Sequence, residues 1–196
     1  MEQAFEIAIN LLHRGACGCE ENTGDGAGLL LQVPDKFLRR ETAALGFTLP
    51  AAGEYGVGML FLPRRADERG QIEALIETMV DEEEQVLLGW RDVPTDNSPI
   101  GETARQGEPT IRQVFIGRGS GIGQGPNAKA RFERTLYIIR KRITRGVDAL
   151  ALHESQLFYI ASLSSQTIVY KGMLIADQLT TMFPDLVDQD MESALP

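Results

Sequence analysis

The sequence predicts an α+β fold, in which strands and helices are mixed along the chain. Short apolar runs bounded by glycine or proline predict strands, and segments with apolar residues at helical spacing predict helices. Two apolar runs that flank Ser164-Ser165-Gln166 further predict a β-hairpin. No internal repeat or linker-like stretch interrupts the 196 residues, so one domain spanning residues 1–196 is expected.

The first half of the chain alternates helical and extended patterns. Residues 5–12 predict a helix, with Phe5, Ala8, Ile9 and Leu12 on one face. After a glycine-rich loop, residues 27–33 predict a buried strand, and Pro34 opens a short helix to about residue 44. Residues 55–62 predict a second strand. The helix that follows has an apolar stripe of Ile72, Leu75, Ile76, Met79 and Val80.

The second half continues in the same way. Residues 86–93 predict a strand, 95–109 a polar loop, and 111–116 another strand. A glycine-rich connection, 117–126, leads into a helix with an apolar stripe of Phe132, Leu136, Ile139 and Ile143. Residues 157–163 and 167–170 are the strands of the expected hairpin, and 176–182 predict a last short helix.

Composition excludes several classes of protein. A formal charge of −9 argues against general nucleic-acid binding, which requires a basic footprint. The sequence contains no apolar run of about 18 residues, so no membrane span is expected. The N-terminus lacks the basic and apolar regions of a secretory signal. Cys17 and Cys19 are too few for a disulfide framework, so reduced thiols and a cytoplasmic location are expected.

The densest group of reactive side chains lies between His13 and Gly28. A zinc site using His13, Cys17 and Cys19 is disfavoured, because no second pair of ligands follows at a suitable spacing. A calcium loop starting at Glu21 fails, since its twelfth position is Gln32 rather than an acid.

Two interpretations of the thiols stay open. Cys17 is a candidate nucleophile with His13 or His153 as its base, whereas two packed thiols in a tight turn are the simpler alternative. The glycines at 24, 26 and 28 indicate a backbone that turns with positive φ or passes close to another strand.

A second glycine-rich segment, Gly117 to Gly125, is placed where a phosphate-binding loop would lie, between a strand and a helix. Pro126 stands where a P-loop requires lysine, and the Gly-x-Gly-x-x-Ala match ending at Ala128 is a weak signal. A mobile surface loop is therefore favoured over a nucleotide-binding module.

The helix expected over residues 127–146 is basic within an acidic chain. Against one acid, Glu133, it carries Lys129, Arg131, Arg134, Arg140, Lys141, Arg142 and Arg145. This pattern favours a solvated face paired with the acids at 81–84, and the alternative is a docking face for an acidic partner surface.

The string from His13 to Gly28 resembles the start of the amidotransferase domain of the glutamate synthase large chain. The same resemblance continues, in one order, through residues 49–55, 57–59, 86–94, 158–165, 167–173 and 183–186. It implies a fold similar to the N-terminal-nucleophile hydrolases, a sandwich of two sheets between helices (αββα), incomplete in this chain. It also implies glutamine as substrate and ammonia as product, for transfer to 2-oxoglutarate.

In the family that this chain resembles, an N-terminal cysteine attacks glutamine while its own α-amine acts as base. Asparagine and glycine groups stabilise the oxyanion. That cysteine should precede the first helix by roughly two dozen residues, and the substrate-binding arginine should follow residues 183–186. No catalytic residue is therefore assigned here. Only Arg14 and Gly15 match positions that border the family's active site.

The expected function is thus a part of a glutaminase domain, truncated at both ends and inactive on its own. The resemblance implies FMN and an iron–sulfur cluster in other domains, with no cofactor or metal in this chain. The remaining domains or subunits of the synthase are the expected partners, and self-association through uncovered apolar faces is expected as well. A non-catalytic scaffold within an amidotransferase complex is the alternative.

Overall fold

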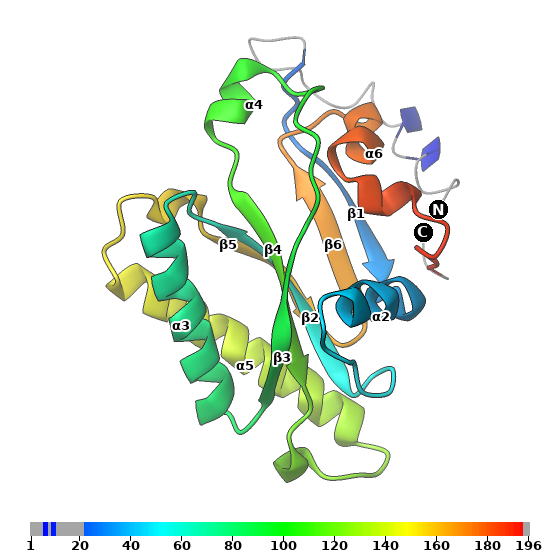
Figure 1. Cartoon of the computed structure of the whole chain (residues 1–196), viewed down its shortest axis with the longest axis vertical. Coiled ribbons are helices and arrows are strands. Elements are labelled where there is room, and N and C mark those ends of the chain that lie inside the picture. Colours follow the sequence, from blue (N-terminus) through cyan, green and yellow to red (C-terminus); the bar gives the residue numbers. More distant parts are fainter. Residues whose placement is uncertain (1–5, 8, 11–21, 194–196) are drawn as a thin grey trace.

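The computed structural model describes residues 6, 7, 9, 10 and 22–193 (Figure 1). Its larger sheet is antiparallel, in the order β3-β4-β2-β5. The strands are β2 (Tyr55–Leu62), β3 (Val86–Asp92), β4 (Thr110–Gly117) and β5 (Tyr159–Ser164). A second, two-stranded antiparallel sheet pairs β1 (Ala27–Gln32) with β6 (Thr167–Gly172). The expected α+β class, with mixed elements and antiparallel sheets, is confirmed.

The helices lie close to their predicted positions. They are α2 (Asp35–Ala44), α3 (Ala66–Glu82), α4 (Glu102–Gln106), α5 (Ala128–Ala149) and α6 (Leu179–Met182), with 3₁₀ turns η2 (Ser120–Ile122), η3 (Ser155–Leu157), η4 (Ala176–Gln178) and η5 (Pro184–Val187). Near the N-terminus, residues 6, 7, 9 and 10 are helical. The prediction of a plain polar loop over residues 95–109 was wrong, since α4 lies within it. This helix has five residues, about one and a half turns, which is too short for a helical repeat of apolar residues to be visible in the sequence.

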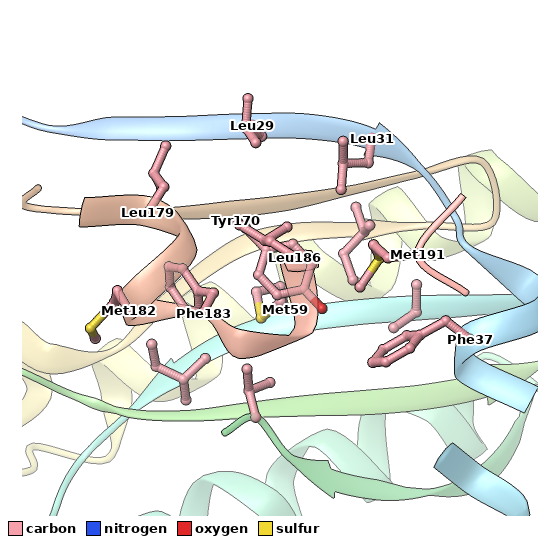
Figure 2. Packing of buried hydrophobic residues seen from close by; sticks show 14 of the residues in the cluster. Leu29, Leu31, Phe37, Met59, Tyr170, Leu179, Met182, Phe183, Leu186 and Met191 are labelled. Carbon is pink, nitrogen blue, oxygen red and sulfur yellow. The ribbon is translucent and has the colours of Figure 1, made fainter. Parts of the chain in front are cut away.

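Alternation along the central strand β2 divides the interior into two cores. Val57 and Met59 face the first core, while Leu60 and Leu62 face the second. The first core fills the space between the two sheets and is closed by α2 and by the segment from α6 to η5 (Figure 2). The second core lies beneath α3 and α5, which cover the opposite face of the large sheet (Figure 1). The predicted stripe of α5 is confirmed as buried. In α3 the stripe faces the core, with Ile72, Ile76 and Val80 buried and Leu75 and Met79 half-buried.

The predicted hairpin between β5 and β6 was wrong. Both strands exist, but β5 pairs with β2 and β6 pairs with β1, so the chain changes sheet at Ser165-Gln166. A two-residue hairpin loop favours glycine or asparagine, and neither is present. Instead the Glu133 carboxylate of α5 accepts hydrogen bonds from the Ser165 amide at 2.6 Å and the Ser164 hydroxyl at 3.0 Å. These bonds hold the turn against the helix.

A buried ion pair ties the first core together. Arg91 of β3 donates from Nη1 and Nη2 to the two carboxylate oxygens of Asp185 in η5, both at 2.8 Å. Nη1 also reaches Gln113 of β4 at 3.2 Å, and Nη2 reaches Glu41 of α2 at 3.0 Å. Tyr170 of β6 donates to Asp185 at 2.9 Å. One network therefore joins both sheets to α2 and η5.

Burial and charge set the protonation of this network. Burial lowers the pKa of Arg91, but the Asp185 carboxylate outweighs it, and the net pKa lies above its ordinary value. Burial, reinforced by Asp185, raises the pKa of Tyr170 well above 10.0. Arg91 is therefore charged and Tyr170 protonated under working conditions, as the hydrogen bonds require.

Replacing Arg91 with alanine is expected to lower the free energy of unfolding by about 3–5 kcal/mol, because Asp185 would stay buried without its cation. Urea unfolding followed by circular dichroism measures this loss. The matched control is Arg64→Ala, which removes an exposed arginine whose ion-pair partner, Glu154, lies 3.9 Å away, and it should leave the midpoint nearly unchanged. Equal losses in the two variants would contradict the central role of the buried pair.

Stability should also fall at alkaline pH. A group whose pKa is higher in the folded state than in the unfolded state stabilises the fold fully below its unfolded pKa, and that contribution is lost as the pH rises. Above pH about 10 the tyrosine ionises in the unfolded chain, whereas burial keeps Tyr170 protonated in the folded one. The free energy of unfolding should therefore fall by about 1.4 kcal/mol per pH unit. Urea unfolding between pH about 9 and 11 should show a shallower decline in Tyr170→Phe than in the parent. Tyr137→Phe, which changes a 59% exposed ring, should keep the parental slope.

Candidate functional site

A hollow with a volume of about 620 Å³ lies beside the β1–β6 pair. Its lining combines the glycine segment that begins β1 with the end of β6 and two aromatic rings. The lining residues are Asp25, Gly26, Ala27, Gly28, Leu29, Leu30, Phe61, Tyr159, Val169, Lys171, Gly172 and Met173. This volume is within the usual range of small-molecule sites.

Glycine is required in this wall because the backbone of β1 runs against that of β6. A Cβ on Gly28 would lie 2.6 Å from Lys171 Cβ and 2.8 Å from the Tyr170 carbonyl oxygen. One on Gly24 would lie 2.4 Å from the Leu174 carbonyl oxygen, and Gly26 has φ of +136°. Close approach and positive φ were the two reasons predicted for these glycines, and both are confirmed.

Three polar side chains face the hollow from different segments. Asp25 is exposed in the glycine segment, Lys171 comes from β6, and Tyr159 begins β5. The Lys171 ammonium lies 4.1 Å from the centroid of the Tyr159 ring. A hydrogen bond from Lys171 lowers the pKa of Tyr159 despite its partial burial. The hollow therefore offers one anionic group and one cationic group on an apolar floor.

A smaller cavity of about 190 Å³ shares the Lys171–Met173 segment with the hollow. Phe61 and Tyr159 line both spaces, and their rings are 6.1 Å apart. Beyond them the lining is mostly apolar, with Ile100 and Ala104 near α4. The aromatic pair and the end of β6 thus contribute to both spaces.

Several predicted site residues lie outside the described residues. His13, Arg14, Gly15, Cys17 and Cys19 belong to the segment 11–21, so the thiol interpretations stay predictions. His153 lies in the turn after α5, where its backbone amide donates to Glu68 at 3.2 Å. Within residues 22–193, no three His, Cys, Asp or Glu side chains gather as a metal site would require. No helix of this region is long and apolar enough to cross a membrane.

The segment Gly117–Gly125 is packed at Gly119 and Ile122 and otherwise runs over the surface, with residues 120, 121 and 123–125 exposed. The predicted surface loop is confirmed for these exposed residues, and its mobility stays a prediction. Ile122 is buried, and the Gly119 amide donates to Gln85 Oε1 at 2.9 Å. A Cβ on Gly119 would lie 1.8 Å from the Glu84 carbonyl oxygen. Close backbone approach therefore explains a glycine that the sequence pattern alone associated with phosphate.

Sequence reasoning missed Tyr159 and Lys171 as members of the site. Both belong to segments on which the family resemblance was based, so the motifs were seen. Their convergence was not noted, although a hairpin with Ser164-Ser165-Gln166 as its loop would also set residue 159 opposite residue 171. In the structure the two residues belong to different sheets, and the Lys171 ammonium lies over the Tyr159 ring.

Comparison with known proteins gives one consistent result. The profile of the family described as glutamine amidotransferases class-II matches residues 1–196. The glutamate synthase [NADPH] large chain of Bacillus subtilis is 43% identical over 99% of this chain, and that of Azospirillum brasilense is 38% identical over 98%. Ferredoxin-dependent glutamate synthase 2 of Arabidopsis thaliana is 40% identical over 92%. The chain spans about 12% of the two bacterial relatives and 11% of the plant one.

Substituting alanine at Gly24 should distort the wall of the hollow, because the new methyl group has no space beside Leu174. A loss of about 1–3 kcal/mol in unfolding free energy is expected, as for other overpacked sites. Gly70→Ala is the matched control, since its Cβ meets no atom within 4 Å in α3 and should stabilise by up to about 1 kcal/mol. Parental stability in Gly24→Ala would rule out the close approach.

Proposed function

This chain belongs to the class II glutamine amidotransferases, and on that premise we propose that it forms part of the glutaminase domain of a glutamate synthase. That domain releases ammonia from glutamine, and the ammonia is transferred to 2-oxoglutarate to give glutamate. The observation that carries the proposal is the 43% identity to a glutamate synthase large chain over 99% of this chain.

The architecture supports the proposal. Two antiparallel sheets enclose one core, and α3 and α5 cover the outer face of the larger sheet. We propose that this is one side of the αββα sandwich of the N-terminal-nucleophile hydrolases. The second helix layer would then cover the outer face of the β1–β6 pair and close over the hollow, which Leu30 and Met173 line with exposures of 52% and 56%.

The hollow is the part of the described structure that best suits a site for glutamine. A free amino acid carries one ammonium and one carboxylate, and Asp25 and Lys171 present complementary charges across the lining. Arg14 and Gly15 precede this wall by about ten residues. We propose that they border the active site, as in the family, and that the catalytic cysteine acts from the segment that precedes them in such enzymes.

The other components of the reaction belong elsewhere in the proposed enzyme. About 88% of the length of the Bacillus subtilis relative lies outside the aligned region. We propose that the FMN and the iron–sulfur cluster of the synthase are held there, and that those domains are the principal partners of this chain. Its residues then bind and position glutamine, while electron transfer takes place in another part of the polypeptide.

The test is glutamine-dependent ammonia release by the whole natural polypeptide that contains this chain. Arg14→Ala should lower kcat/KM for glutamine hydrolysis about tenfold or more, equivalent to about 1.4 kcal/mol of lost transition-state stabilisation. The matched control is Arg64→Ala, an arginine with a 52% exposed side chain, and its rate should be unchanged. Both variants should still form glutamate from 2-oxoglutarate when free ammonia is supplied in place of glutamine.

Two results would contradict the proposal. A polypeptide that consumes no glutamine would instead support the non-catalytic scaffold. Glutamine hydrolysis that Arg14→Ala leaves unchanged would show that Arg14 does not border the site.

A further inference from the structure

Helix α5 concentrates positive charge in a chain whose formal net charge is −9. Its apolar stripe packs on the second core, so its charged side chains lie on its flanks and on its outer face. The cations are Lys129, Arg131, Arg134, Arg140, Lys141, Arg142 and Arg145, against the acids Glu133 and Asp148. None of these cations lines the hollow proposed for glutamine.

Contacts within the chain occupy only some of these cations. Arg142 pairs with Glu82 and Glu83, so the predicted pairing of the basic helix with the acids at 81–84 is confirmed for this arginine. Arg140 donates to the Ile160 carbonyl oxygen at 2.6 Å. Across residues 22–193, no ion pair joins a carboxylate to the remaining cations, namely Lys129, Arg131, Arg134, Lys141 and Arg145.

The first half of α5 extends past the end of α3. Arg142 contacts Glu82 in the last turn of α3, and a Cβ on Gly146 would touch Leu75, so the two helices run antiparallel. Helix α3 therefore lies beside α5 only from about residue 142 onward, and residues 128–141 project beyond it (Figure 1). The acids of α3 consequently neither pair with the cations of this first half nor screen them.

The outer face of this first half combines cations with large apolar side chains. Arg131, Arg134, Ile138 and Lys141 follow one another at spacings of three, four and three residues, which places them on one side of the helix. All four are exposed, and Tyr137 beside them is 59% exposed. The Lys141 ammonium lies 5.6 Å from the centroid of the Tyr137 ring. We refer to these five residues as the basic patch.

The composition of the basic patch is that of a protein contact. Tyrosine and arginine are enriched in the centres of interfaces, and an exposed isoleucine between them adds apolar area. Nucleic acid is a poor match, because it requires a broad basic footprint and the chain as a whole is acidic. Carboxylates are the groups that arginine and lysine bind most strongly in proteins. The complementary surface is therefore an acidic protein surface with an apolar centre.

The size of the basic patch decides between a free partner and a tethered one. At 1.5 Å per residue and a width of about 10 Å, residues 128–141 offer a footprint on the order of 200 Å². Interfaces between separate molecules bury about 800 Å² per partner, so this patch is too small to hold a free protein or a second copy. A partner on the same polypeptide needs far less area, because tethering raises its effective concentration to about the millimolar range.

We propose that the basic patch is the docking site for an acidic surface in the remaining part of the same longer polypeptide. This inference rests on the proposed function, which makes the chain one part of a synthase whose bacterial relatives it spans to about 12%. The patch then holds the glutaminase domain in one orientation against the domain that it contacts. Charge complementarity of this kind selects the orientation even where the contact itself is weak.

Zero-length cross-linking of the whole natural polypeptide with a carbodiimide, followed by mass spectrometry, tests the proposal. The reagent joins a lysine amine to a carboxylate only where the two are in contact. Lys141 of the basic patch should become linked to an aspartate or glutamate outside residues 1–196. Lys36 is the internal standard, because its ammonium lies 2.8 Å from Asp190 and should give a link within the chain.

A single substitution in the basic patch provides the comparison. Arg134→Gln should lower the yield of the Lys141 link about fivefold or more, as expected for a central arginine of a contact, and leave the Lys36 link unchanged. It should also raise the rate at which hydroxyl radicals oxidise Tyr137, because the ring loses its cover. The matched control is Arg64→Gln, an arginine whose side chain is 52% exposed, and it should alter neither readout.

Three results would overturn the proposal. One is a Lys141 that links only to carboxylates within residues 1–196 while the Lys36 link forms. Another is a Lys141 link between two copies, seen when isotope-labelled and unlabelled polypeptides are mixed. The third is a Tyr137 oxidation rate that is equal in the parent and in Arg134→Gln, which would show a solvated face. None of these readouts requires glutamine, so they are independent of the ammonia-release test of the proposed function.

Discussion

The pairing of Arg91 with Asp185 is the interaction on which the arrangement of the sheets depends. The two residues are separated by 94 positions, yet their side chains meet twice at 2.8 Å inside the first core. Tyr170, Gln113 and Glu41 complete the network, so β6, β4 and α2 each contribute a polar group as well. Apolar packing alone would tolerate several orientations of two stacked sheets. A bidentate pair accepts one geometry, and it thereby fixes β6 over β4.

The hollow is a consequence of that fixed orientation. With β6 held over the large sheet, its end carries Lys171 to the beginning of β5, where Tyr159 lies. At Gly28, and at Gly24 just before β1, the backbone then passes too close to β6 and to Leu174 for a side chain, and glycine makes this approach possible. The site is thus assembled by sheet packing, and no single loop contains it.

Most of the elements could be predicted from local sequence, because periodicity and glycine or proline boundaries are local signals. The apolar stripes of α3 and α5 and the close approach at Gly28 are examples. What failed depended on distant residues. The sheet change after β5 relies on Glu133, thirty-two positions before Ser165, and the packing of Gly119 relies on Glu84. Arg91 and Asp185 both lie in motifs that carried the family resemblance, but nothing local indicates that they meet.

The register of β1 with β6 has a consequence for the order in which the molecule is made. Ala27 pairs with Gly172, about 145 residues later, so the wall of the hollow cannot close until nearly all of this chain has left the ribosome. At ordinary rates of synthesis that interval is roughly 7–30 s. Throughout it, the Leu-Leu-Leu run of β1 is an unpaired apolar strand. During that interval β1 has no strand partner for its backbone groups, and β6 supplies that partner by completing the smaller sheet.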